Sequence, residues 1–286
     1  MTSTVAGEAA RLWRQVEPDR IAVSWRSLLV RLLLVLVGAQ QAAAGRADGY
    51  LTEVLDAQGL DPDPVGGVRI RSGSLAGVAS DGRDLSGLLY RPVVTTLAGI
   101  GAGATVDRAL AGGAAHLDMI VRTQVADAGR VADQVALTAR PSVTGYVRMV
   151  VGGTCSRCIL LAGQRYRWNT GFQRHPNCDC VHVPAAEDTA DDVRTDPRRY
   201  FGSLDAAEQD RVFTKAGAEV IRDGADIGQV VNARRGMYTA ADGRKLTREG
   251  ARRRRMERLM PEQILRDAAG NRDEAIRLLR QHGYLI

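Results

Sequence analysis

All four cysteines of this 286-residue chain lie between residues 155 and 180, and their spacing indicates metal chemistry. The order is Cys-x2-Cys, nineteen residues, then Cys-x-Cys, with a histidine three residues before the third cysteine. Thiolate and imidazole groups at such spacings bind zinc tetrahedrally, with Zn–S bonds of about 2.3 Å. The pattern predicts a metal site with four ligands drawn from Cys155, Cys158, His175, Cys178 and Cys180.

The second half of this site can be formed in more than one way. Cys178 and Cys180 are alternate residues of a predicted strand, so their side chains point to the same face. His175 and Cys178 form an equally good pair across the turn "HPNC", and His182 lies close by in sequence. The sequence does not choose between these pairs.

A structural zinc ion is the role that the segment favours. Its forty or so residues contain few large apolar side chains, and chains that small usually need a metal, a disulfide or a neighbour to fold. Structural zinc contributes about 10–16 kcal/mol in small fingers. Tyr166, Trp168 and Phe172 are expected to form an apolar cap beside the ion. The alternatives are four buried free cysteines, a redox Cys-x-x-Cys pair, and a catalytic metal with an open position.

The chain lacks the usual signatures of catalysis. Its four histidines are His116, His175, His182 and His282, and no GxSxG, HExxH or phosphate-loop pattern occurs. Asp179 is the only acid between residues 155 and 186, whereas a catalytic metal requires a nearby carboxylate base. We therefore expect a protein that is not an enzyme, with a protease or nuclease as the less favoured alternative.

The elements that must position the cluster are mostly helical. Aromatic residues make up only 5% of the chain, so the core depends on Ala, Leu and Val, and Ala and Leu favour helices. Apolar periodicity predicts helices over residues 3–16, 19–58 (weakened by glycines), 84–99 and 104–139. The expected apolar face of the last comprises Val106, Leu110, Leu117, Val121, Val125, Ala128, Val131 and Val135.

Strands are expected at "VTGYVRMVV" and "CDCVHV", and short helices follow them. Ser203 is a predicted N-cap, Pro261 a first helical residue, and Asn271 with Glu274 a capping pair. The predicted fold is mainly α, with long amphipathic helices, a small metal-stapled α+β subdomain and short C-terminal helices. The expected regions are 1–100 (helical), 101–141 (long connecting helix), 142–186 (Cys/His subdomain) and 187–286 (C-terminal helices).

The most apolar run, "SLLVRLLLVLVGAQQAAAG", contains Arg31, and its dense part covers about ten residues where a membrane span needs roughly 20. We interpret it as a helix packed in the core or against a partner, with a membrane segment as the alternative. The first residues do not resemble a secretion signal, so we expect a reducing compartment and cysteines that are not in disulfides.

Residues 243–260 form a basic run. The eight basic residues outnumber the acidic ones by six, which equals the net charge of the whole chain, +6. Such a run can contact the phosphates of double-stranded DNA without sequence preference, or an acidic protein, or can simply be solvated. The contact residues would be Arg244, Lys245, Arg248, Arg252, Arg253, Arg254, Arg255 and Arg258.

The stretch "CSRCILLAGQRYRWNTGFQRHPNCDC" resembles the minor head proteins of tailed phages, in the phage Mu F-like (MuF) class and particularly its actinobacteriophage form. The stretches "GVASDGR", "VFTKAGAEVIRDGADIGQVVNARRGMYT" and "MPEQILRDA" are similar to the same form, so the resemblance covers about residues 75–286. The matching motif positions are Cys155, Cys158, His175, Pro176, Cys178 and Cys180.

The resemblance implies a structural component present in few copies inside the virion head, made in the host cytoplasm. It implies association with the portal and with capsid or scaffold proteins during head morphogenesis, and a part in DNA packaging or ejection. No membrane partner is expected. The alternative function is a zinc-dependent nucleic-acid-binding protein, or a capsid maturation protease, the label that some relatives carry.

Overall fold

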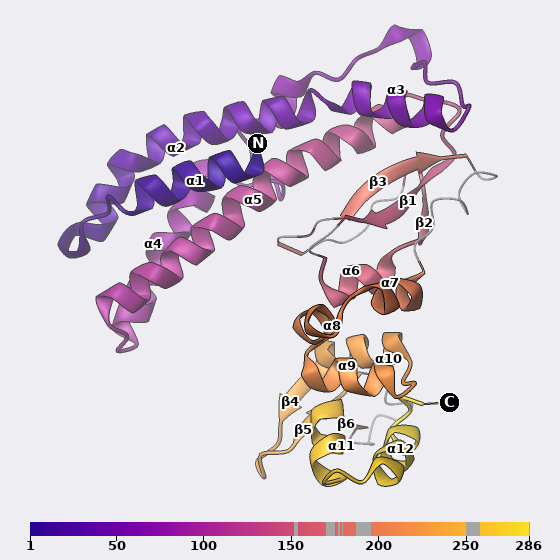
Figure 1. The fold of residues 1–286 in the computed structure, drawn as a ribbon. Coiled ribbons are helices and arrows are strands. Elements are labelled where there is room, and N and C mark those ends of the chain that lie inside the picture. The colour runs from indigo at the N-terminus through magenta and orange to yellow at the C-terminus, as the bar shows by residue number, and fades with distance from the viewer. Residues whose placement is uncertain are drawn as a thin grey trace. The chain divides into compact units, whose positions relative to one another are not determined.

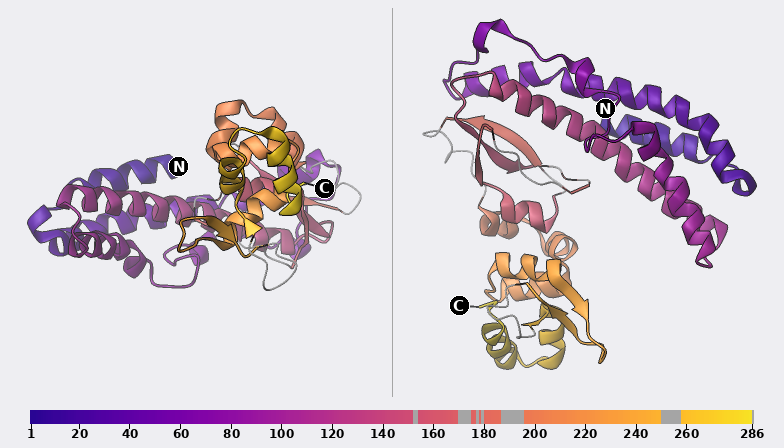
Figure 2. Two further views of the ribbon diagram at one scale, coloured as in Figure 1. Left: turned by 90° about the horizontal axis from the view of Figure 1, so that it is seen from below. Right: turned by 180° about the vertical axis from the view of Figure 1, so that it is seen from behind.

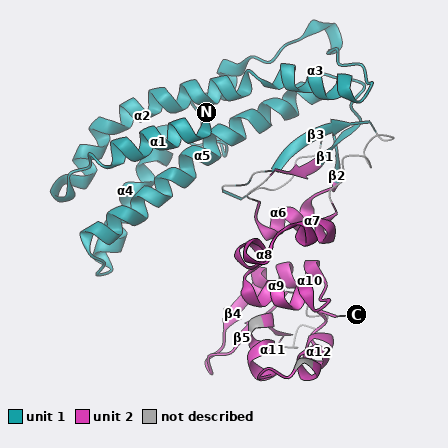
Figure 3. Cartoon of the chain, viewed as in Figure 1, with its two compact units in different colours: residues 1–147, 165–192 teal, residues 148–164, 193–286 magenta. Residues whose placement is uncertain are grey.

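The computed structural model of the chain describes residues 1–151, 154–169, 175–176, 178, 180–186, 196–249 and 258–285 (Figure 1). These residues are mainly helical and include two small three-stranded sheets, which confirms the predicted fold class. The chain forms two compact units, Met1–Val147 with Arg165–Asp192, and Arg148–Gln164 with Val193–Ile286 (Figure 3). The division into four regions stays a prediction.

The first unit is built on one long helix. Three helices pack along its N-terminal half, and a fourth packs on its C-terminal part, as the views from below and behind also show (Figure 2). The long helix is α5, and the others are α1, α2 and α4 on the first half and α3 on the second. Their bounds are α1 (Thr2–Trp13), α2 (Ile21–Ala44), α3 (Ala47–Ala57), α4 (Leu85–Gly101) and α5 (Val106–Thr138).

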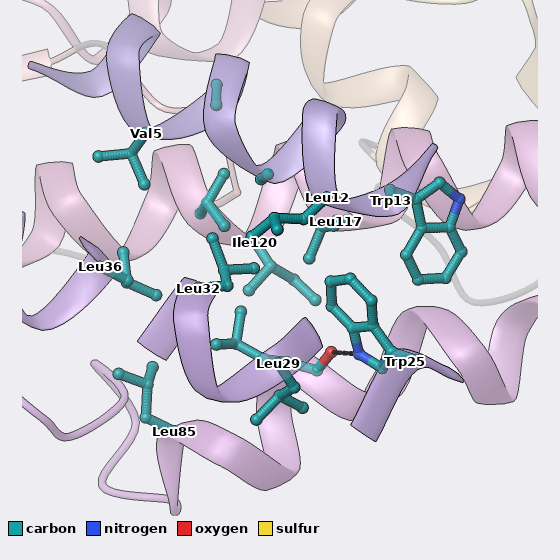
Figure 4. Close-up of a cluster of buried hydrophobic side chains, with 14 of the residues drawn as sticks. Val5, Leu12, Trp13, Trp25, Leu29, Leu32, Leu36, Leu85, Leu117 and Ile120 are labelled. Carbon is teal, nitrogen blue, oxygen red and sulfur yellow. Dashed lines mark hydrogen bonds between the residues drawn. The ribbon is translucent and has the colours of Figure 1, made fainter. Parts of the chain in front are cut away.

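Two tryptophans organise the core of this bundle (Figure 4). Trp13 and Trp25 pack edge to face, with ring centroids 4.9 Å apart. Each indole nitrogen donates to a helix carbonyl, Trp25 to that of Leu89 at 2.9 Å and Trp13 to that of Leu110 at 3.0 Å. These bonds satisfy the polar edge of each buried ring, so both tryptophans can be buried without an unpaired donor.

Gly113 allows the close approach of α1 and α4 to α5. A Cβ at this position would lie 2.2 Å from Oγ1 of Thr96 and 2.5 Å from the ring of Trp13. The packing therefore requires a residue without a side chain at this point of α5, despite the cost of glycine within a helix.

The predicted apolar face of α5 is correct in the middle and wrong at both ends. Leu117, Val121 and Val125 are buried, whereas Val106 and Val135 are 38% and 49% exposed. The buried residues near the C-terminal end are instead Ala132, Ala136 and Leu137, which contact α3. The buried face shifts because α1 and α4 contact the first part of α5, whereas α3 and the C-terminal end of α2 contact its last part.

The apolar run forms α2, which is buried along one face only. Trp25, Leu32 and Leu36 lie in the core, while Val30 and Leu34 are 59% and 73% exposed. The stretch Pro18–Ala57 is long and apolar enough to cross a membrane by length and composition, and 28% of its most apolar window is buried. Of the three glycines expected to weaken this region, Gly45 lies between the end of α2 and the start of α3, whereas Gly38 and Gly49 lie within the two helices.

A three-stranded sheet follows α5 in the order β2-β1-β3, which confirms the two predicted strands. Its members are β1 (Gly145–Val150), β2 (Arg165–Arg167) and β3 (Cys180–Ala185). Helix α3 anchors β3, because Tyr50 Oη donates to the carbonyl of His182 at 2.6 Å. Gln58, the C-cap residue of α3, donates from its side-chain Nε2 to the carbonyl of Pro184 at 2.8 Å. Burial raises the pKa of the Tyr50 phenol, and the charge of Asp133 adds to this effect.

The second unit consists of short helices around an apolar core that includes Phe201, Phe213 and Tyr284. A hairpin and a short third strand form its sheet, in the order β4-β5-β6. The helices are α6 (Ser156–Leu161), α7 (Pro197–Ser203), α8 (Ala206–Phe213), α9 (Lys215–Arg222), α10 (Ile227–Ala233), α11 (Pro261–Asp267) and α12 (Arg272–Gln281). The strands are β4 (Met237–Thr239), β5 (Lys245–Thr247) and β6 (Arg258–Leu259).

The predicted helix starts in this unit are confirmed in two of three cases. Pro261 is the first residue of α11, and the Asn271 side chain accepts from the backbone nitrogen of Glu274 at the start of α12. The Ser203 prediction is wrong, because Ser203 ends α7 and Asp205 caps α8 by accepting from Glu208 N at 2.8 Å. An ionised carboxylate makes the stronger hydrogen bond to a helix N-terminus.

Candidate metal centre

The Cys-x2-Cys half of the candidate centre is a helix start. Cys155 has an extended backbone and caps α6, and its Sγ accepts from the backbone nitrogen of Cys158 at 3.5 Å. The turn thereby brings the two cysteines together, as the spacing predicts. Cys158 is 1% exposed, whereas Cys155 is half-buried.

A buried arginine lies against this half. Arg148 of β1 is 1% exposed, and its Nη2 donates to Sγ of Cys158 at 3.2 Å. The backbone of Arg148 is fixed by two hydrogen bonds, from its nitrogen to Gln164 O at 3.0 Å and from Gly163 N to its carbonyl at 2.8 Å. A cationic donor next to sulfur suits a thiolate, which is the form that binds metal.

The Cys-x-Cys half lies at the start of β3. Cys178 and Cys180 are 4% and 0% exposed. The backbone nitrogen of Cys178 donates to the carbonyl of His175 at 3.2 Å, which brings these two candidate ligands close together. Arg130 of α5 donates from Nε to the carbonyl of Cys180 at 2.8 Å and from Nη2 to the carbonyl of Cys178. Both cysteine backbones are therefore held by one side chain.

The five predicted ligands gather in two groups that share Cys158. One group is Cys155, Cys158 and His175, and the other is Cys158, Cys178 and Cys180. Within each group the ligand atoms lie within 4.8 Å of one another. In a tetrahedral site with Zn–S bonds of about 2.3 Å, neighbouring sulfurs are roughly 3.8 Å apart, so this cluster could hold a metal ion. All four cysteines are outside disulfides.

Burial separates the candidate ligands into two kinds. Cys158, Cys178 and Cys180 are buried, while Cys155 and His175 are half-buried. His175 and Pro176 border a cavity of about 280 Å³, lined further by the loop at Ser80 and by Asp127 of α5. The three buried sulfurs thus form one group of candidate ligands, and Cys155 and His175 are the two candidates for the fourth ligand position.

Other residues that the sequence placed near the cluster have different surroundings. His182 is 4% exposed, but its ring packs on Tyr146 with centroids 4.6 Å apart, and neither ligand group includes it. Tyr166 stacks on Tyr146, and Trp168 is 42% exposed. Phe172 and Asp179 lie outside the described residues. The predicted aromatic cap is therefore placed only in part.

The described members of the basic run fall into different environments. Arg244 and Arg248 are exposed, and Lys245 is half-buried at the start of β5. Arg258 is 4% exposed and donates to the carbonyls of His282, Glu249 and Gly283, with its guanidinium 3.8 Å from the centroid of Tyr284. This placement argues against a DNA contact through Arg258. Arg252, Arg253, Arg254 and Arg255 lie outside the described residues.

Sequence reasoning missed Arg130 and Arg148. Both appear in segments whose apolar pattern predicts a helix or a strand, where an arginine is normally a solvent-facing residue. At about 100° per residue, Arg130 lies opposite the predicted apolar face of α5, so its position indicates a solvent-facing side chain and no sequence signal points to its burial.

These features define a mainly helical protein with a cluster of Cys and His side chains that can bind a metal. A family model described as "VG15 protein" matches residues 100–207, which include α5 and the Cys/His segment but less than half of the chain. The match supports a phage-encoded protein. No curated protein and no solved structure matches the chain.

Proposed function

We propose that this chain is a structural minor head protein of a tailed phage, of the MuF-like class. In this role it associates with the portal and the head interior during head morphogenesis and DNA packaging or ejection. One observation carries the proposal: the family match at residues 100–207 includes the Cys/His segment whose motif resembles the MuF class. The protein would be made in the host cytoplasm and then reside in the virion.

The exposed face of α2 supports an assembly role. Val23, Val30 and Leu34 are spaced by seven and four residues, so they share one face, and each is more than half exposed. Helix α2 contains two arginines and no acidic residue. An apolar helix with acidic flanks on a portal or head protein would complement this face in both hydrophobicity and charge.

Zinc is the proposed ion, and its proposed role is structural. Thiolate ligands select zinc over the hard cations that prefer oxygen. Three candidate ligands are buried cysteines, which is typical of a closed structural site without an open position for substrate. The proposed protein is therefore not an enzyme.

The exposed part of the basic run supports a second contact. Arg244 and Arg248 flank β5 at the surface of the second unit, and Arg248 lies over the ring of Tyr238, 5.1 Å from its centroid. In a DNA-filled head these side chains would contact phosphates without sequence preference. An acidic protein surface is the alternative partner.

Quantitative mass spectrometry of purified virions tests the proposed role. The expected result is this chain at a small, fixed ratio to the major capsid protein, retained in particles that are washed at high salt and treated with nuclease. Its absence from virions and from purified empty heads, while it is abundant in infected cells, would refute the proposal.

A further inference from the structure

Asp127 and Arg130 form a buried ion pair on α5. Arg130 is 7% exposed and Asp127 is 9% exposed, and Nη1 of the arginine lies 3.2 Å from Oδ1 of the aspartate. Removing two charges from water is costly, and their mutual attraction offsets the cost only when the remaining donors are also satisfied. The stability of α5 alone therefore does not explain why both charges are buried.

The remaining donors of Arg130 go to the candidate metal ligands. Nε donates to the carbonyl of Cys180 at 2.8 Å, and Nη2 donates to the carbonyl of Cys178. The three guanidinium nitrogens thus each have a different acceptor, and two of these acceptors flank the Cys-x-Cys sequence. A planar fork with donors in fixed directions can hold two carbonyls in register, which an ammonium group cannot do.

We propose that Arg130, oriented by Asp127, is a positioning residue that presets Cys178 and Cys180 as metal ligands. This inference rests on the proposed metal site. Fixing the two carbonyls fixes the backbone, and with it the directions of both Cα–Cβ bonds that carry the sulfurs. Groups that orient metal ligands in this way typically change metal affinity by about 10–100-fold when they are removed.

The same contacts couple the metal to α5. If Arg130 favours the arrangement of cysteines that binds the ion, then bound ion must favour the position of Arg130 to the same extent, because linkage is reciprocal. Metal binding therefore stabilises α5 around residues 127–130 more than it stabilises the start of the helix, where α1 and α4 provide the contacts.

The test compares Arg130→Lys with Arg140→Lys in the full-length chain. Arg140 is a matched control, since it is 1% exposed, pairs with Asp48 at 3.2 Å and donates to the carbonyls of Pro62 and Ala136. Zinc affinity is measured by competition with a chromogenic chelator, and thiolate coordination by the charge-transfer absorption of the cobalt(II)-substituted protein.

We expect Arg130→Lys to weaken zinc binding by about 10–100-fold, and Arg140→Lys to lower Tm while leaving zinc affinity within about threefold. Asp127→Asn should weaken zinc binding less than Arg130→Lys does. The loss of zinc-binding free energy in the double variant should be smaller than the sum of the losses in the two single variants. Wild-type affinity in Arg130→Lys, or equal losses in both lysine variants, would overturn the positioning role. A wild-type protein that binds neither ion would refute the metal site itself.

Hydrogen exchange of the wild-type protein tests the coupling without any variant. Metal-loaded and chelator-treated samples are compared, and we expect amides 124–134 to lose more protection on metal removal than amides 108–118. Equal changes in both segments would overturn the coupling, even if Arg130→Lys failed to fold.

Discussion

Nη2 of Arg148 lies 3.2 Å from Sγ of Cys158, and both residues are only 1% exposed. Cys158 is also the one residue common to both groups of candidate ligands. A buried guanidinium therefore donates to the sulfur on which the whole cluster depends.

Replacing Arg148 by Met should weaken zinc binding by about tenfold, because the thiolate loses its charge-assisted hydrogen bond. Arg157→Met is the control, since Arg157 is an exposed neighbour of Cys158 and carries the same charge. Chelator competition measures both variants. Equal affinities in Arg148→Met and the wild type would show that this hydrogen bond does not support the ligand.

The ligand residues should differ in their response to substitution. Cys158→Ser should abolish stoichiometric zinc binding, because Cys158 belongs to both groups. Cys178→Ser and Cys180→Ser should act similarly, whereas only one of Cys155→Ser and His175→Ala should do so, since four ligands complete the site. Zinc content after purification under reducing conditions measures this. Full zinc content in Cys158→Ser would contradict the proposed centre.

Much of this centre could be predicted from sequence, because cysteine spacing is a local property. The two pairs and His175 come together as the pattern indicates. The roles of Arg130 and Arg148 could not be predicted, since each depends on a contact between segments distant in sequence, and an arginine within an apolar pattern is usually exposed. Arg258 shows the reverse case, because its position in a basic run concealed its burial.

The fold was predictable where apolar periodicity is strong. It was less predictable where tertiary packing determines which residues are buried and where a helix begins. Helix α5 has nearly the expected bounds, but its buried face shifts from Val125 to Ala132 and Leu137, where α3 and the C-terminal end of α2 pack against it. Similarly, Ser203 is predicted as a cap, but it ends α7 and Asp205 caps α8, because the position of the cap depends on where α7 ends.

Charged substitutions test whether the outer face of α2 contacts the portal or the head. Val30→Glu combined with Leu34→Glu should reduce binding to portal rings or empty heads by at least tenfold, because the apolar contact is lost. Each surface substitution should change the free energy of unfolding by no more than about 0.5 kcal/mol. Val68→Glu is the control, at a loop position that is 53% exposed. Unchanged head binding by the double variant would exclude α2 as the contact.

The basic run should divide into residues that bind and residues that support the fold. Arg258→Met leaves three carbonyls without their donor, so it should lower the free energy of unfolding by about 3 kcal/mol. Arg244→Gln with Arg248→Gln should leave stability nearly unchanged and should reduce the slope of log affinity for DNA against log salt by about 2. Arg211→Gln, another exposed arginine of the second unit, is the control for DNA binding. A stable Arg258→Met variant with weaker DNA binding would reverse this assignment.

Acid should destabilise the second unit through His282. Burial, and then the positive charge of Arg258, lower the pKa of His282, while Asp267 opposes them. The unfolded chain therefore binds the proton more readily than the folded chain. Above about pH 6.5 protonation of His282 does not reduce the free energy of unfolding, and this free energy declines as pH falls below that value. Neutral His282 also accepts at Nδ1 from the backbone nitrogen of Leu259, 3.4 Å away. Denaturant unfolding at pH 7.5 and 5.5 should show a smaller loss in His282→Gln than in the wild type, and equal losses would contradict this origin.

Co-sedimentation of the full-length, zinc-loaded chain with portal rings and with empty heads tests the proposed structural role in the head. It is performed at low and high salt, with and without double-stranded DNA. We expect the chain to associate with portal or heads at high salt as well as at low salt, and without DNA. Sedimentation only with DNA, lost at high salt, would contradict a structural head role and would favour a nucleic-acid-binding protein that acts outside the particle.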